Sequence, residues 1–149
     1  CGDTPLSSGR HAWRVTIDCI SSFGNSIAIG IVEAGKQLER KSYRDPSFYG
    51  IDTHYASWAW SAGKADGPTE FRRIQSGHEI DVLLDVDKGE LTIFLLYNAQ
   101  RRVWQNLPKG KAWLPHFYLG ERSGAPVTRS SPLLRQQGKL HSRRDCRPE

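Results

Sequence analysis

The sequence lacks long hydrophobic runs and has few cysteines. Its longest uninterrupted apolar run covers residues 27–32, whereas a membrane-spanning helix needs about 20 residues. We therefore expect no transmembrane helix and no membrane partner. The 3 cysteines, Cys1, Cys19 and Cys146, are an odd number without C-x-x-C spacing, which excludes a disulfide framework. This cysteine usage predicts a cytoplasmic protein, with the nucleus as the alternative.

Methionine is absent altogether, and no leader with a charged and then an apolar stretch opens the chain. A chain that begins with Cys1 is expected to be a processed protein or a piece of a longer one, and we take it as a fragment. Its 149 residues predict a single domain. Folding at this size buries roughly 70% of the surface of the unfolded chain, so a core can form without disulfides or metal.

Most of the chain has no excess of positive or negative charge. The formal net charge is +5, yet residues 1–121 contain 14 Lys plus Arg and 14 Asp plus Glu. The whole surplus follows Glu121. We therefore expect no basic groove for nucleic acid on the folded part, and any attraction to phosphate would belong to the tail alone.

Catalytic and metal-binding motifs are also lacking. The 5 histidines show no i, i+4 pair, so no zinc site is expected. Asp85 and Asp87 resemble part of a calcium loop, but the glycine comes one residue early and no glutamate follows at the twelfth position, so they are interpreted as turn formers. Gly63-Lys64 lacks the rest of a phosphate loop. We expect no enzyme, no metal and no cofactor.

What the sequence does contain is a period of two. Apolar and polar residues alternate over 12–20 and again over 79–86, residues 27–32 are apolar throughout, and a mainly apolar stretch at 91–97 follows Asp87-Lys88-Gly89. These patterns predict a half-exposed strand, a central strand and a hairpin. Shorter strands are predicted at 48–51, 57–61, 70–74, 102–107 and 113–119, and one polar helical turn at 36–43.

The short spacing of these strands leaves no room for crossover helices and predicts an all-β antiparallel sandwich. The residues expected in its core include Trp13, Ile29, Ile31, Val82, Leu84, Leu91 and Ile93, and Phe94 is interpreted in the same way. A last strand is predicted at 125–128. We set the domain at residues 1–130 and expect a disordered basic tail over 131–149, because little apolar surface there offsets the chain entropy.

Aromatic residues make up 10% of the chain, and most are expected in the core. Others lie in or beside polar turn segments, where aromatic side chains are typical anchors of protein interfaces. The ligand-binding residues predicted on this basis, with the neighbouring carboxylate, are Tyr43, Phe48, Tyr49, Asp52, His54 and Tyr55. The loops expected to carry the contacts cover residues 21–25, 36–47 and 53–56.

Several stretches, in order, resemble one family. SGRHAWRVTID, SIAIGIVEA, YGID, SGHEIDVLLDVDKGELTIF, NLP and WLPHFYLG are similar to the successive motifs of SPRY domains over roughly residues 7–128. The matching positions are Gly9, Trp13, Val15, Gly30, Tyr49, Gly50, Gly77, Ile80, Asp85, Leu91, Phe94, Asn98, Leu107, Pro115 and Leu119.

This resemblance implies a bent sandwich of two antiparallel sheets, of the concanavalin A-like jelly-roll type, without catalytic activity. It further implies a protein or peptide ligand bound by loops at one end, often as the targeting module of an adaptor or ubiquitin-ligase protein. We expect a monomeric domain. The alternative is a lectin-like sandwich, in which an aromatic ring stacks on a sugar and Asp or Asn bonds its hydroxyls.

Overall fold

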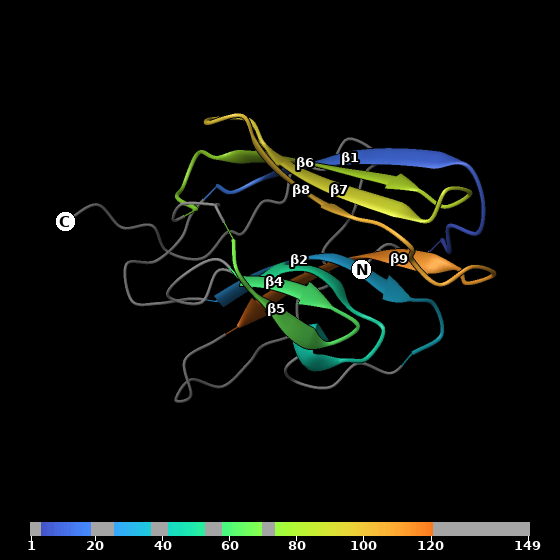
Figure 1. The fold of residues 1–149 in the computed structure, drawn as a ribbon. Helices are drawn as coiled ribbons and strands as arrows, with labels where there is room; N and C mark the ends of the chain where they lie inside the picture. Colours follow the sequence, from blue (N-terminus) through green and yellow to red (C-terminus); the bar gives the residue numbers. More distant parts are fainter. Residues whose placement is uncertain (1–3, 19–25, 37–41, 53–57, 70–73, 121–149) are drawn as a thin grey trace.

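The computed structural model describes residues 4–18, 26–36, 42–52, 58–69 and 74–120. Two antiparallel β-sheets lie face to face (Figure 1), and the described residues contain a single short 3-10 turn and no α-helix. The predicted all-β sandwich is therefore confirmed. The predicted strand at 125–128, most of the predicted strand at 70–74 and the tail at 131–149 lie outside the described residues.

One sheet has four strands in the order β1-β6-β7-β8, all antiparallel to their neighbours. They are β1 (Arg10–Thr16), β6 (Glu79–Asp85), β7 (Glu90–Leu95) and β8 (Gln100–Trp104). The other sheet has five strands in the order β5-β4-β3-β2-β9. They are β2 (Ser26–Glu33), β3 (Tyr49–Asp52), β4 (Trp58–Ser61), β5 (Lys64–Pro68) and β9 (Trp113–Gly120), and the 3-10 turn η1 (Ser42–Arg44) precedes β3.

The two strongest sequence patterns correspond to the expected elements. The continuous apolar run forms β2, which pairs with β3 on one side and β9 on the other and is buried from Ile27 to Val32. The predicted hairpin is β6 and β7, and Gly89 in its turn has a φ of +69°. Asp85 forms part of this turn, because its Oδ1 accepts a hydrogen bond from the Lys88 N–H at 2.9 Å.

Two element predictions need correction. Strand β5 was missed because Gly63-Lys64, Gly67 and Pro68 are typical of turns, yet residues 64–68 pair with β4 next to a bulge. Strand β8 begins at Gln100 and ends at Trp104, not over 102–107. The left-handed φ of +62° at Asn106 interrupts the extended chain before the predicted end.

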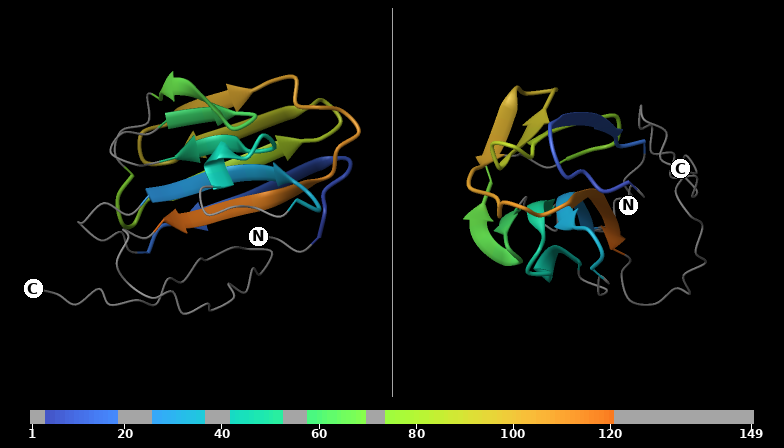
Figure 2. Two further views of the ribbon diagram at one scale, coloured as in Figure 1. Left: turned by 90° about the horizontal axis from the view of Figure 1, so that it is seen from below. Right: turned by 90° about the vertical axis from the view of Figure 1, so that its right-hand side faces the viewer.

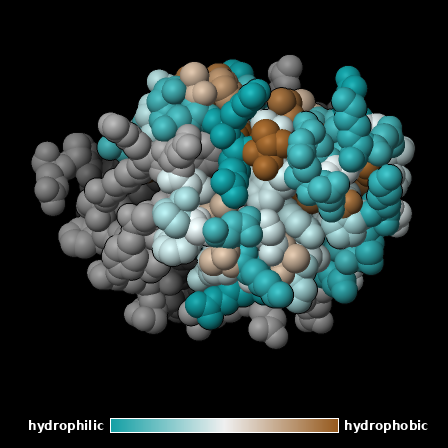
Figure 3. Space-filling view, in the orientation of Figure 1, coloured by the Kyte–Doolittle hydropathy of each residue, from teal (hydrophilic) through white to brown (hydrophobic). Residues whose placement is uncertain are grey.

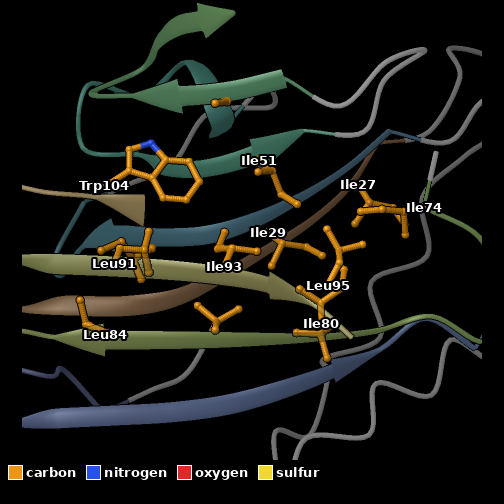
Figure 4. Close-up of a cluster of buried hydrophobic side chains, with 14 of the residues drawn as sticks. Ile27, Ile29, Ile51, Ile74, Ile80, Leu84, Leu91, Ile93, Leu95 and Trp104 are labelled. Carbon is orange, nitrogen blue, oxygen red and sulfur yellow. The ribbon is translucent and has the colours of Figure 1, made fainter. Parts of the chain in front are cut away.

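The core fills the space between the two sheets (Figure 4). Isoleucine and leucine side chains dominate it because strands that pack face to face bury every second residue. Of the predicted core residues, six are fully buried: Ile29, Ile31, Val82, Leu84, Leu91 and Ile93.

Trp13 and Phe94 are exceptions to the predicted core. Trp13 is only half-buried, because β1 is the outermost strand of its sheet. Phe94 is also half-buried, since it alternates with the buried Ile93 and Leu95 and so faces outward, opposite Asp81 of β6.

The sandwich has two long sides. Figure 2 (right) shows β1 and β9 along one side and β8 and β5 along the other. In the orientation of Figure 1, the coloured residues show hydrophobic groups only as small separate patches among hydrophilic ones (Figure 3). Among the described residues, no helix is long and apolar enough to cross a membrane.

Candidate binding face

A second apolar cluster lies on the outer face of the five-stranded sheet. Along β2, Ile27, Ile29 and Ile31 belong to the core between the sheets, whereas Ala28 and Val32 point the other way. These two pack with the buried Phe48 and with four partly buried residues, Tyr43, Trp60, Leu114 and Tyr118. The turn η1 lies across this face (Figure 2, left). The sheet is therefore covered on both faces at its centre.

Two glycines allow the chain before β3 to lie so close to the sheet. Gly30 and Gly50 are partners in the β2–β3 register. A Cβ on Gly30 would lie 2.0 Å from the Tyr49 carbonyl oxygen, and one on Gly50 would lie 2.8 Å from Cζ of the Phe48 ring. The Phe48 ring therefore packs directly on glycine backbone, and a side chain at either glycine would collide with its surroundings.

A buried hydrogen bond fixes η1 to β9. His116 Nε2 and Ser42 Oγ are 2.7 Å apart, and both residues are buried. The Phe48 ring meets the His116 ring edge-on, with centroids 5.8 Å apart. Burial lowers the pKa of His116 from 6.5 to about 4. The imidazole is therefore neutral near pH 7, which suits an apolar contact with Phe48.

This attachment places Tyr43 between two other aromatic residues. Its ring centroid is 4.9 Å from that of Trp60 on β4 and 6.4 Å from that of Tyr118 on β9. The Arg44 guanidinium carbon lies 6.0 Å from the Tyr43 ring centroid. Three rings from three separate parts of the chain thus form one continuous aromatic surface.

Trp58 extends this surface toward the end of the sheet. Trp58 pairs with Asp52, Asp52 with Ala28, and Ala28 with Tyr118, so these four residues form one row across four strands. Residues directly opposite one another in a sheet share a face. Trp58 is 38% exposed and Asp52 only 4%. We call Tyr43, Trp58, Trp60, Tyr118 and Asp52 the aromatic face.

The chemistry available on the aromatic face is that of binding. The rings offer flat apolar surface for stacking, whereas the carboxylate of Asp52 next to Trp58 is buried in the sheet. Trp60 Nε1 is buried and has no hydrogen-bond partner. Within the described ranges, no three His, Cys, Asp or Glu side chains gather in a way that could hold a metal ion.

The structure places the sequence-predicted ligand residues in different surroundings. Tyr43 and Asp52 belong to the aromatic face. Phe48 is 0% exposed and supports η1 from beneath. Tyr49 points into the space between the sheets, where its ring meets that of Trp113 edge-on at 5.7 Å and burial raises its pKa. His54 and Tyr55, like the predicted loops 21–25 and 53–56, lie outside the described residues.

Three residues of the aromatic face were not singled out from the sequence. Trp58 and Trp60 were not distinguished from the other aromatic residues, most of which are expected in the core, and Tyr118 was included only within a strand. The available signal was the spacing of the tryptophans at i and i+2, which puts both on one face of a strand. Their partners could not be foreseen, because Tyr43 and Tyr118 come from parts of the chain far apart in sequence.

The outer face of the four-stranded sheet is different in character. Arg14 bonds Asp81 through Nε at 2.7 Å, and Arg10 bonds Asp85 through Nε at 2.8 Å. The hydrogen bond that Asp85 accepts from the Lys88 N–H lowers its pKa most, and the hydrogen bond from Arg10 lowers it further. This face thus carries ion pairs at the protein surface, which contribute little to stability.

Comparison with known proteins identifies the fold. No family model matches the chain, and no curated protein matches its sequence. Among solved structures, the TRIM65 PSpry domain is similar, with a TM-score of 0.56 and 22% identity over 80% of this chain. The SPRY domain of human HERC1 is similar with a TM-score of 0.55 and 9% identity, over 83% of this chain and 81% of that domain. This chain spans 63% of the length of the TRIM65 structure. The protein thus has the SPRY-type β-sandwich fold.

Proposed function

We propose that this domain is a non-catalytic protein-interaction module that recognises a peptide or a protein surface through the aromatic face. The observation that carries the proposal is the position of Trp58, which is 38% exposed beside Asp52 at the end of the row leading to Tyr118. Tryptophan and tyrosine dominate the binding energy of protein interfaces, especially where neighbouring residues exclude water.

The rigidity of the aromatic face supports this function. Its residues stand on paired strands or on η1, which the His116–Ser42 hydrogen bond and the buried Phe48 hold against the sheet. A surface that is already in its binding conformation loses less entropy when a ligand binds. The face therefore suits recognition of a short ligand segment.

The wider role follows from the resemblance of the sequence to SPRY domains. We propose that the domain is the partner- or substrate-targeting part of a larger adaptor or ubiquitin-ligase protein, acting as a monomer in the cytoplasm or nucleus. The similarity to the TRIM65 and HERC1 structures supports the fold on which this role would depend.

A random peptide library displayed on phage tests the proposed function. We expect the domain to select peptides of related sequence, and Trp58→Ala to weaken their binding by at least about tenfold. Leu83→Ala is the matched control, because Leu83 is 46% exposed on the opposite sheet. Equal loss of binding in both variants, or none in either, would contradict the proposal. A glycan array that gives clear ligands while the peptide library gives none would favour the lectin alternative.

A further inference from the structure

The position of the aromatic face within its sheet restricts how a ligand can be held there. Trp58 and Trp60 stand on β4, which pairs with β3 on one side and β5 on the other, and Asp52 stands on β3, which pairs with β2 and β4. The backbone groups of these two strands are therefore engaged within the sheet. Strand addition, which needs a free sheet edge, is excluded at this place, and a ligand meets side chains alone.

The side chains of the aromatic face supply hydrogen-bond donors without an accessible carboxylate. The indole N–H groups of Trp58 and Trp60 donate and cannot accept. Trp60 Nε1 has no hydrogen-bond partner within the described part of the chain. The carboxylate of the face belongs to Asp52, which is only 4% exposed. A ligand that matches this surface therefore presents carbonyl oxygens rather than N–H groups.

The arrangement of the rings sets the spacing of the contacts. The Tyr43 ring is tilted by 56° against the Trp60 ring and by 61° against the Tyr118 ring, so the surface is uneven. Trp58 and Trp60 stand two residues apart on one strand, which separates their Cα atoms by about 7 Å. Two residues of a polyproline II helix advance by about 6 Å. Successive residues of such a helix therefore match the spacing of the two indoles.

We propose, on the basis of the interaction function proposed above, that the ligand is a proline-rich segment in the polyproline II conformation. Such a segment has no internal hydrogen bonds, so its carbonyl oxygens are available to the indole N–H groups. Its prolines lack N–H groups that would need an acceptor, and their rings pack on aromatic side chains. A helical ligand, in contrast, uses most of its carbonyl groups within the helix.

Arg44 adds a preference for charge beside the prolines. It is exposed, and its guanidinium carbon lies 6.0 Å from the Tyr43 ring centroid. The neighbouring Asp45 is engaged in its own turn, because its Oδ1 accepts a hydrogen bond from the Ser47 N–H at 2.8 Å. The charge that lies against the rings is therefore positive. Complementary charge confers specificity, so the ligand carries Asp or Glu at the end of the proline-rich segment that lies beside Tyr43.

Three displayed octapeptide libraries of equal size test the proposal. One has the pattern X-X-P-X-X-P-X-X, the second has alanine at both proline positions, and the third is random throughout. We expect binders to be at least about tenfold more frequent in the proline library than in the alanine library, with Asp or Glu enriched at the outer positions. Trp58→Phe keeps a ring but loses the N–H, and should weaken binding of the selected peptides by about threefold to tenfold.

Variants of Arg44 test the preference for acidic residues. Arg44→Ala should abolish the enrichment of Asp and Glu among the selected peptides, whereas Arg44→Lys keeps the charge and should retain it. Arg101→Ala is the matched control, because Arg101 is exposed and stands on β8 of the opposite sheet, and this variant should select the same peptides as the unaltered chain.

The three libraries separate failure of this inference from failure of the proposed function. Binders from the random library that depend on Trp58 but contain no proline would overturn the inference and leave the proposed function standing. Absence of any Trp58-dependent binder from all three libraries would overturn both. Enrichment of acidic residues that survives Arg44→Ala would overturn the role of Arg44.

Discussion

His116 Nε2 lies 2.7 Å from the hydroxyl oxygen of Ser42, and this contact joins β9 to a turn 74 residues earlier in the chain. It holds η1 on the sheet and thereby positions Tyr43 between Trp60 and Tyr118. The proposed binding surface therefore depends on a buried polar contact that no ligand would touch directly.

The low pKa of His116 predicts a dependence of stability on pH. The unfolded chain protonates this residue near pH 6.5, whereas the folded protein does so only near about 4. Between these values the unfolded state binds more protons, so the free energy of unfolding falls as the pH is lowered, by up to about 3 kcal/mol for this residue. Urea unfolding of the protein and of His116→Gln should show a flatter profile for the variant between pH 6.5 and 4. Parallel profiles would contradict the assignment. Loss of the ionised Asp85 contributes at lower pH in both proteins.

The glycine pair beneath Phe48 predicts a large cost for a single methyl group. In Gly30→Ala, the new Cβ would lie 2.0 Å from a backbone oxygen that has no freedom to move away. We expect a loss of more than about 3 kcal/mol in unfolding free energy, or failure to fold. Gly35→Ala is the control, with open space around its Cβ but a φ of +78°, and should cost only about 1 kcal/mol. Similar melting temperatures for the two variants would show that the backbone of β3 at Tyr49 can move away from the new methyl group.

The alternation of buried and exposed residues along the hairpin predicts very different losses of stability at two nearby positions. Ile93 is 0% exposed between the sheets, so Ile93→Ala should lower the free energy of unfolding by about 2–5 kcal/mol. Leu83, on the facing strand, is 46% exposed, so Leu83→Ala should change it by less than about 0.5 kcal/mol. Chemical denaturation of both variants checks the expectation, and a comparable loss in each would argue against the described register.

Much of the fold was predictable because the side chains along a strand alternate between the two faces of its sheet. The continuous apolar run of β2 and the hairpin around Gly89 are local patterns, and each corresponded to the expected element. Strand β5 was missed because its glycine and proline are typical of turns, and pairing with β4 outweighs these preferences. Trp13 and Phe94 were assigned to the core because residue type alone does not show which strand is outermost or which face points outward.

The candidate site was predictable only in part, because it is built from long-range pairs. Tyr43 and Asp52 were selected from the sequence, and both belong to the aromatic face. Their neighbours Trp58 and Tyr118 depend on the strand order β4-β3-β2-β9, which no local pattern indicates. Phe48 was selected as an aromatic beside a polar turn, and its burial follows from the glycine pair that lies below it.

The proposed boundary of the domain predicts the effect of shortening the chain. Residues 131–149 contain few apolar residues and carry much of the surplus positive charge. Their deletion should leave the melting temperature and peptide binding unchanged within error, because residues 1–121 are already balanced in charge and the deleted segment offers little apolar surface to pack. A fall of several degrees would show that Leu133, Leu134 or Leu140 packs on the sandwich.

The most direct test of the central claim maps a bound peptide onto the tryptophans. A peptide selected from the random library is titrated into ¹⁵N-labelled protein, and the five indole N–H resonances are followed by NMR. We predict that the signals of Trp58 and Trp60 shift in proportion to the bound fraction, while those of Trp13 and Trp104 stay in place, because these two pack with the core between the sheets. Shifts confined to Trp13 or Trp104, with Trp58 and Trp60 unchanged, would place the ligand elsewhere and contradict the assignment of the aromatic face.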